Sequence, residues 1–152
     1  GLIRHSPFRA ADFTPNSLRL VTCFQTIEHV YDPLALAKDS FELLKPGGAF
    51  FIVCHNRRAL LARAMGLKSP IFDIEHLQLF SPESIKRLFE RAGFSSVVVH
   101  TVVNSYPINY WARLFPFPSK LKPQALELLQ KSGLGRLKLA APVGNLAAIG
   151  YK

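Results

Sequence analysis

The sequence predicts an α/β protein built on a mainly parallel sheet. Two short β-favouring, apolar runs, residues 17–24 and 49–54, are separated by one helical segment, residues 32–44. This strand–helix–strand order is the βαβ unit, which places two parallel strands side by side. A second capped helical segment and further β-branched runs follow, so we expect strands and helices to alternate through the chain.

The first three elements have clear boundaries. Residues 17–24 (SLRLVTCF) have the length expected of a buried strand, and the helix over 32–44 starts at an Asp32 cap. The turn sequence KPGG at 45–48 stops that helix. Because the next run, AFFIVC at 49–54, is continuously apolar, it predicts a strand covered on both faces.

Caps and turn residues also delimit the later elements. The segment 57–66 predicts a helix that ends at a glycine, and 81–94 predicts one with a serine cap, a proline in the first turn and a C-terminal glycine. β-Branched residues over 94–103 predict a strand, and 145–152 predict a final one. Prolines interrupt the region between these two strands, in which 123–133 predict one amphipathic helix.

Composition limits the class of protein. The 152 residues are 49% hydrophobic and 19% charged, which predicts one globular domain over 1–152. No apolar run approaches the roughly 20 residues that span a bilayer, and the first residues lack a signal-peptide pattern. We therefore expect a soluble, cytoplasmic protein without a membrane span. Cys23 and Cys54 lie in apolar segments without metal-binding spacing, so we expect two buried thiols.

Positive charge is concentrated toward the C-terminus. The net charge is +9, and residues 101–152 contain seven Lys or Arg against one Asp or Glu. Such a segment can meet phosphate, an acidic lipid surface or an anionic substrate, and it serves more often as a solvated face. Charge alone therefore leaves the partner open.

The tripeptide IEH occurs twice, with unrelated flanking sequences that argue against an internal repeat. Glu28 and His29 follow the first predicted strand, whereas Glu75 and His76 lie in the long segment after the second. His55 lies at the end of that second strand. Because ligands of open α/β sheets bind outside the carboxyl ends of the strands, we expect the two copies to form two walls of one site.

Further motifs carry a family resemblance. EHVYDP, LLKPGG and FSPESIKRLFERAGF occur in this order, and APVGNLAAIGYK closes the chain. Together they resemble the C-terminal half of class I S-adenosylmethionine-dependent methyltransferases, in particular those that act on small molecules such as quinone precursors or sugars. The resemblance implies a Rossmann-like sheet with an antiparallel C-terminal strand, and S-adenosylmethionine as the cofactor of the complete enzyme. It also implies a small-molecule acceptor. The prolines and the positive, apolar composition of residues 104–144 predict that this region is a substrate cover inserted into the domain.

The resemblance further assigns residues to the cofactor. The family's first strands, its glycine-rich loop and its ribose-binding acidic residue are not found before the first predicted strand, so we expect the chain alone to be inactive. The residues implied at the cofactor are Asp12 and Phe13 beside adenine, and Cys23, Phe24 and Gln25 beneath the methionine part. The alternatives are a solvated loop aspartate for Asp12 and an ordinary core residue for Phe24.

The histidines of the two IEH segments are candidates for a general base in methyl transfer. Methyl transfer from a sulfonium needs a positioned nucleophile and, for a weakly acidic acceptor, a general base. Histidine suits that task because its free pKa of roughly 6.5 leaves much of it neutral at cell pH. We expect His76 to be the base with Glu75 beside it, and Glu28 and His29 to orient cofactor and acceptor. For each histidine the alternative is a hydrogen-bonding surface residue.

A metal site competes for the same residues. Some quinone-type relatives bind a divalent ion through the segment that contains Glu28 and His29, and Gln25 stands where those relatives have Glu. Because hard cations prefer charged oxygen ligands, the missing carboxylate predicts no metal.

Two functions outside catalysis stay open. The first is a non-catalytic methyltransferase-like fragment that binds a partner. The second is a nucleic-acid-binding module. The basic C-terminal third and three aromatic residues, Tyr106, Tyr110 and Trp111, support this possibility. Because these aromatic residues are interleaved with prolines rather than arrayed along one strand, we do not expect nucleic acid as a partner. No sequence feature predicts the oligomeric state.

Overall fold

The computed structural model describes residues 3, 5–69, 71–114, 118 and 120–152. The chain divides into two compact units. Unit 1 consists of Gly1–Val102 and Gly144–Lys152, and unit 2 consists of Val103–Val143. Every residue predicted at the cofactor or at the catalytic site belongs to unit 1.

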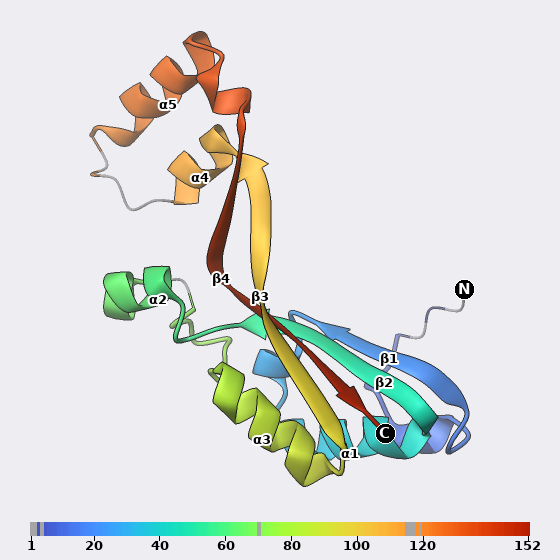
Figure 1. Ribbon diagram of the computed structural model, residues 1–152. Helices are drawn as coiled ribbons and strands as arrows, with labels where there is room; N and C mark the ends of the chain where they lie inside the picture. Colours follow the sequence, from blue (N-terminus) through green and yellow to red (C-terminus); the bar gives the residue numbers. More distant parts are fainter. Residues whose placement is uncertain (1–2, 4, 70, 115–117, 119) are drawn as a thin grey trace. The chain divides into compact units, whose positions relative to one another are not determined.

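Four strands form a sheet in the order β1-β2-β4-β3 (Figure 1). β1 (Leu18–Phe24) pairs in parallel with β2 (Leu44–His55), as a βαβ unit requires. β4 (Lys138–Tyr151) lies on the other side of β2 in antiparallel orientation, and β3 (Ser96–Pro107) follows as the outer strand. The predicted α/β fold and its antiparallel C-terminal strand are confirmed.

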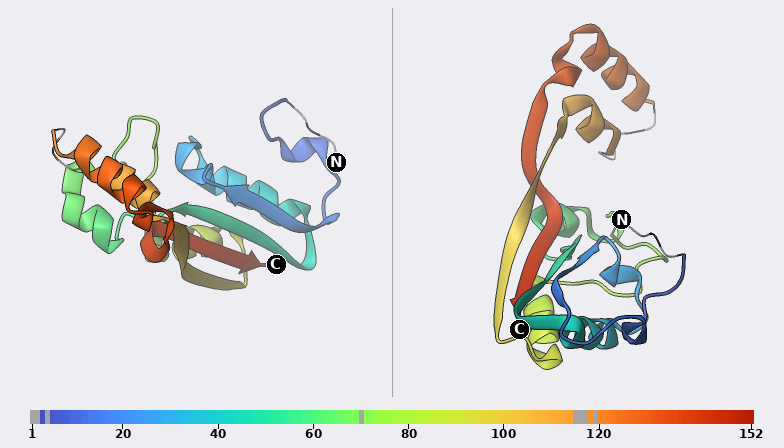
Figure 2. Two further views of the ribbon diagram at one scale, coloured as in Figure 1. Left: turned by 90° about the horizontal axis from the view of Figure 1, so that it is seen from above. Right: turned by 90° about the vertical axis from the view of Figure 1, so that its right-hand side faces the viewer.

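The helices α1 (Pro33–Leu43) and α3 (Pro82–Ala92) begin and end close to the predicted residues. The Asp32 carboxylate accepts a hydrogen bond from the Ala35 amide (2.9 Å), which satisfies one free amide at the start of α1. After α3, Gly93 has a φ of 107°, a left-handed conformation that glycine adopts without a steric penalty. The two helices contact each other and lie against the same face of the sheet (Figures 1 and 2).

β2 differs from its prediction in length and in burial. It begins at Leu44, so the KPGG residues lie inside the strand, where the pairing with β1 shifts its register. Farther along, Phe50, Ile52 and Cys54 are buried, whereas the residues that alternate with them are half-buried. The prediction of a strand covered on both faces is therefore wrong for the described residues, because α1 and α3 cover one face of β2 and leave the other partly accessible.

Stacked aromatic rings form the centre of the core of unit 1. Phe50 of β2 and Phe89 of α3 are fully buried with ring centroids 5.2 Å apart, and Phe94 packs on both rings. Gly150 of β4 lies against this group: a Cβ atom at residue 150 would be 2.5 Å from Phe89 Cδ2. The sheet approaches these rings so closely because residue 150 has no side chain.

Short elements complete unit 1. The helix predicted over 57–66 is limited to α2 (Leu60–Met65). Single turns of 3-10 helix lie at η1 (Ala10–Asp12), η2 (Ile27–His29) and η3 (Gly66–Lys68). The two cysteines are free thiols, Cys54 buried and Cys23 partly buried, in near agreement with the prediction of buried thiols.

Unit 2 contains the helices α4 (Ile108–Leu114) and α5 (Lys122–Lys131), followed by the turn η4 (Leu134–Arg136). The sequence predicts α5 but not α4, because a proline before a helix resembles an interruption. In the structure this proline ends β3, and α4 starts directly after it. The expected cover over 104–144 includes residues 115–117 and 119, which lie outside the described residues.

Aromatic packing organises the described part of unit 2. The ring centroids of Tyr106, Tyr110 and Trp111 lie 4.5 to 6.0 Å apart, and Trp111 Nε1 donates a hydrogen bond to the Leu139 carbonyl (2.9 Å). These rings therefore pack on one another and do not form a row. In neither unit is a described helix long and apolar enough to cross a bilayer.

Candidate active site

The candidate site forms where β1 and β2 end. Gln25 follows β1 with a positive φ of 47°, and its amide donates to the Val53 carbonyl (2.8 Å), which ties the turn to β2. The chain then enters η2, which is the first IEH segment. Because β2 ends at His55, this turn and His55 share the carboxyl edge of the parallel strand pair. Their predicted position at one edge is confirmed.

The second IEH segment is held against the first by hydrogen bonds. His29 donates from Nδ1 to the Glu75 carbonyl (2.8 Å), and the Gln78 amide donates to the Glu28 carbonyl (3.0 Å). The rings of His29 and His76 have centroids 4.8 Å apart. The predicted juxtaposition of the two segments is therefore confirmed, whereas the catalytic roles of their residues stay predictions.

Glu28 lies in a setting that is unusual for a carboxylate. Its side chain is 1% exposed, and neither of its oxygens has a hydrogen-bond partner among the described residues. The His55 ring lies beside it, with Nδ1 at 3.6 Å from Oε1. Burial of a carboxylate without hydrogen bonds is unfavourable by several kcal/mol, so this group needs a proton, a cation or a polar ligand.

His76 completes a compact group of donor atoms around Glu28. Its ring centroid lies 4.9 Å from that of His55, and its Nδ1 is buried without a hydrogen-bond partner in the described part of the chain. One donor atom from each of Glu28, His55 and His76 lies within 4.8 Å of the other two. The three residues come from η2, the end of β2 and the segment before α3, so the fold alone brings them together.

Burial controls the ionisation of the groups around Glu28. Burial lowers the pKa of His55, and the neighbouring Glu28 carboxylate opposes this effect. The pKa values of the Cys23 and Cys54 thiols are raised, first by burial and second by the charge of Glu28. Near pH 7 the His55 ring is therefore mainly neutral, with one nitrogen able to accept a proton or bind a ligand, and both thiols keep their protons.

The residues predicted at the cofactor occupy two places. Cys23, Phe24 and Gln25 lie at the end of β1, directly before the first IEH segment. The Phe24 ring is 50% exposed and packs edge-to-face on a ring of β2, so the alternative of an ordinary core residue is wrong. Asp12 and Phe13 lie at the end of η1, which contacts α1, and both side chains are exposed.

Glu75 reaches the site through its backbone. Its side chain is exposed, its carbonyl accepts the hydrogen bond from His29, and its amide donates to the Asp73 carboxylate (3.0 Å). Sequence reasoning did not find Asn145 of β4, whose side chain hydrogen-bonds to His55. Residues 55 and 145 are opposite each other in the antiparallel β2–β4 pair, a register that no sequence motif indicates.

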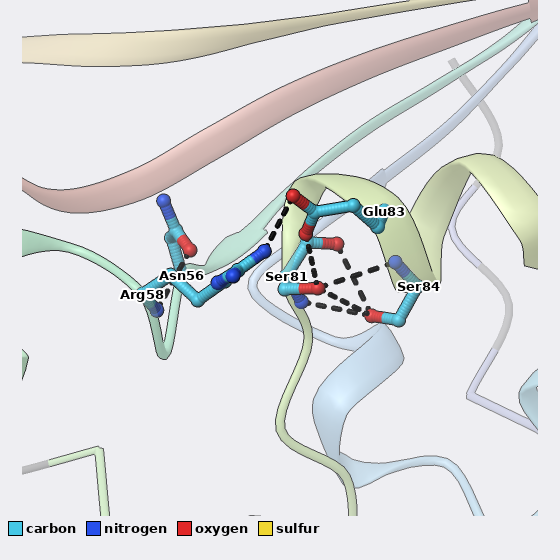
Figure 3. A network of polar contacts seen from close by, with 5 residues as sticks. All are labelled: Asn56, Arg58, Ser81, Glu83 and Ser84. Carbon is cyan, nitrogen blue, oxygen red and sulfur yellow. Dashed lines mark hydrogen bonds and ion pairs between the residues drawn. The ribbon is translucent and has the colours of Figure 1, made fainter.

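A polar network fixes the start of α3, just after the second IEH segment (Figure 3). The Ser84 amide donates to Ser81 Oγ (3.2 Å), and the Ser81 amide donates to Ser84 Oγ (2.8 Å), which confirms the predicted serine cap. Glu83 accepts hydrogen bonds from Ser81 Oγ (2.9 Å) and from the Arg58 guanidinium (2.5 Å). Arg58 and Glu83 thus join the two ends of the segment 58–83, which contains His76.

A family model described as a methyltransferase domain matches residues 3–100 of the sequence. The chain belongs to this methyltransferase family. The match confirms the predicted family and S-adenosylmethionine as the cofactor that goes with it. The matched residues contain all predicted site residues of this methyltransferase chain.

The methyltransferase chain is also similar to individual proteins. It is 28% identical over 101 residues to a protein of Idiomarina loihiensis named ubiquinone biosynthesis O-methyltransferase, a match that covers 61% of this chain and 41% of the relative. It is 30% identical over 92 residues to a probable S-adenosylmethionine-dependent methyltransferase of Mycolicibacterium smegmatis, covering 60% of this chain and 34% of that protein. The matches therefore span less than half of the length of these relatives.

Solved structures share the fold of the methyltransferase chain. One is a methyltransferase of Thermotoga maritima described as a possible histamine N-methyltransferase, with a TM-score of 0.59 at 20% identity, covering 92% of this chain and 58% of that chain. Another is a methyltransferase of Archaeoglobus fulgidus, with a TM-score of 0.58 at 20% identity, covering 94% of this chain and 63% of that chain. These likenesses support the Rossmann-like methyltransferase fold.

Proposed function

We propose that this chain forms the acceptor side of an S-adenosylmethionine-dependent methyltransferase that acts on a small molecule. The observation that carries the proposal is the group of three imidazole rings, His29, His55 and His76, at the carboxyl edge of the parallel strands. His29 of this group follows the β1 turn, where the family resemblance expects the methionine part of the cofactor. A base beside the reacting methyl group is what transfer to a weakly acidic acceptor needs.

A hydroxyl group is the acceptor function that we favour. A neutral imidazole accepts the proton of a hydroxyl group, whereas an amine that reacts through its lone pair has less need of a base. The name of the Idiomarina loihiensis relative, a ubiquinone biosynthesis O-methyltransferase, supports a quinone precursor. A sugar hydroxyl is the second acceptor of this class, and it would use the same base.

The residues after β1 fit the cofactor. S-adenosylmethionine supplies a methyl group bonded to a positively charged sulfur. The half-exposed Phe24 ring offers an apolar contact, and the positive φ of Gln25 turns the backbone at the sheet edge. The chain contains neither the glycine loop nor the ribose carboxylate of the family, so these residues contribute only part of the binding site.

Each residue of the two IEH segments has a separate task in this proposal. His76 takes the proton of the acceptor hydroxyl on Nδ1, which has no competing hydrogen bond among the described residues. The bound cofactor would supply the methyl group, and loss of the proton to His76 would leave the acceptor oxygen with the electron pair for the new bond. His29 fixes the second segment through the Glu75 carbonyl, and the Glu28 carboxylate favours the charged form of the neighbouring His55 ring.

The full-length protein, with isotopically labelled S-adenosylmethionine, tests the function. Phenols, catechols, sugars and amines serve as acceptors, and mass spectrometry detects transferred label. We expect label on a hydroxyl oxygen of one acceptor class, strongly reduced in His76→Ala and unchanged in His100→Ala, a histidine of β3 outside the group. A full-length protein that binds the cofactor but labels none of these acceptors would contradict the proposal.

A further inference from the structure

The strongest unexplained feature of the chain is the buried Glu28 carboxylate. It is 1% exposed, and both oxygens lack hydrogen-bond partners among the described residues. Nδ1 of His55 and Nδ1 of His76 are likewise buried without hydrogen bonds. Four unsatisfied polar atoms around one point are uncommon, since buried polar groups in proteins are nearly always paired. We infer that Glu28, His55 and His76 bind one divalent transition-metal ion of the Zn²⁺ type.

The distances in this group agree with such an ion. Ligands at about 2.0–2.2 Å from a tetrahedral ion lie about 3.4 Å from one another. The distance from Glu28 Oε1 to His55 Nδ1 is 3.6 Å, and all three donor atoms lie within 4.8 Å of one another. Small rotations of the His76 side chain would close the remaining gap, because this ring lies in an irregular segment between η3 and α3.

The donor types select the class of ion. Two imidazole nitrogens and one carboxylate oxygen form the ligand set of many zinc sites that keep a fourth position open. A hard cation such as Mg²⁺ prefers a shell of oxygens, which this group does not offer. The sequence predicts no metal, and that prediction rests on the preference of hard cations for carboxylates in the segment with Gln25, Glu28 and His29. The present site shares only Glu28 with that set.

The surroundings of the histidines support metal binding. Histidine ligands usually donate their second ring N–H to a protein acceptor, which fixes the tautomer. The Asn145 side chain, opposite His55 in the β2–β4 pair, interacts with the His55 ring and can serve as such a partner. Nδ1 of His55 lies 3.6 Å from Glu28 Oε1.

An ion pair between Glu28 and a protonated His55 explains fewer of the unpaired atoms than a bound cation does. A protonated His55 beside Glu28 would account for the contact at 3.6 Å. It would leave the second Glu28 oxygen and His76 Nδ1 without a partner, and the nearby His76 ring disfavours a positive charge on His55. One cation bound to all three residues accounts for these atoms together.

The inference does not depend on the proposed methyl transfer. A metal ion on His76 Nδ1 and a proton on the same nitrogen exclude each other, so the metal-loaded protein lacks His76 as a free base. Metal binding by the chain can therefore be measured without cofactor, acceptor or turnover.

The test is a titration of the purified, chelator-treated 152-residue chain with Co²⁺ and with Zn²⁺. Visible absorption reports four-coordinate Co²⁺, calorimetry gives the Zn²⁺ stoichiometry, and thermal unfolding reports stabilisation by the bound ion. We expect one ion per chain, no thiolate-to-cobalt absorption band, and a rise in the unfolding temperature. The absence of the thiolate band separates this site from Cys23 and Cys54.

Matched variants locate the ion. Glu28→Gln and His76→Gln keep side-chain volume and remove one ligand each, and we expect at least a ten-fold loss of affinity in both. His100→Gln, on β3, is the control and should bind as the parent does. Circular dichroism shows whether each variant is folded. The inference is overturned if the folded parent chain binds no ion at one equivalent, or if folded Glu28→Gln and His76→Gln bind as tightly as the parent.

Discussion

His29 Nδ1 donates a 2.8 Å hydrogen bond to the backbone carbonyl of Glu75. This contact joins the two copies of IEH, which lie on opposite sides of α1 and β2 in the sequence. Because the acceptor is a backbone carbonyl, the contact positions the whole second segment, including His76, whose ring lies 4.8 Å from that of His29. The two histidines therefore have different expected effects when they are removed.

His76→Ala is expected to lower the rate of methyl transfer by about 100- to 10,000-fold with little change in cofactor affinity, because it removes only the base. His29→Ala should lower the rate and also weaken acceptor binding, since it releases the segment that holds His76. Steady-state kinetics of the chelator-treated full-length protein measures both effects. Equal turnover in His76→Ala and the parent would remove the base assignment.

The 152-residue chain is expected to bind S-adenosylmethionine more weakly than the full-length protein does. Its residues include the turn after β1 but neither a glycine loop nor an acidic residue for the ribose, and backbone amides of such a loop supply much of the binding to a nucleotide-like ligand. Isothermal calorimetry on the chain and on the full-length protein makes the comparison. Micromolar binding by the chain alone would contradict this prediction.

Gly150→Ala is expected to destabilise unit 1 by about 1–3 kcal/mol, the usual effect of overpacking a core. The new methyl group would lie 2.5 Å from Phe89 Cδ2 and 2.9 Å from Phe94 Cγ, and both rings are buried. Urea unfolding measures the change. In the double variant with Phe89→Leu the two effects should be less than additive, because the smaller side chain makes room for the methyl group. Strict additivity would show that the clash is relieved elsewhere.

Ser81→Ala is expected to lower the free energy of unfolding by about 1 kcal/mol, as loss of an N-cap usually does. Ser81 Oγ accepts from the Ser84 amide and donates to Glu83, so both interactions disappear with it. Ser132→Ala, at the end of α5, removes an exposed hydroxyl that caps no helix N-terminus and should change stability by less than about 0.5 kcal/mol. Equal effects of the two substitutions would contradict the capping role.

Glu83 predicts a pH dependence of stability. Hydrogen bonds from its own backbone amide, from Arg58 and from Ser81 lower its pKa to about 2. A carboxyl with a depressed folded-state pKa stabilises the fold above its unfolded pKa of about 4.3, and the contribution is lost as the pH falls toward 2.

Glu83→Gln should therefore lower the unfolding temperature at pH 7, and the difference from the parent should shrink between about pH 4 and pH 2. Because Glu83 is exposed, the difference should also shrink in high salt. Thermal unfolding followed by circular dichroism at several pH values measures both trends. If the difference in unfolding temperature between Glu83→Gln and the parent stayed constant from about pH 4 to about pH 2, the substitution would act through packing rather than through charge.

Sequence patterns a few residues long predict the ends of those helices that are fixed by residues close to them in the chain. Asp32, Ser81 and Gly93 mark the ends of α1 and α3 because capping bonds and left-handed turns form within a few residues. The helix α4 is missed because Pro107 before it resembles a break, and its start depends on the Ile108 amide, which donates to the distant Leu137 carbonyl (2.9 Å).

Periodicity, caps and the geometry of parallel strands are enough to predict the βαβ unit, the capped helices and the position of both IEH segments at the carboxyl edge. The burial of Glu28 beside the exposed His29, and the position of His55 between Glu28 and Asn145, are seen only in the folded chain. Burial and donor geometry depend on how separate segments pack, and the residues that pack here are far apart along the chain. The neighbours of a side chain in the sequence do not specify those contacts.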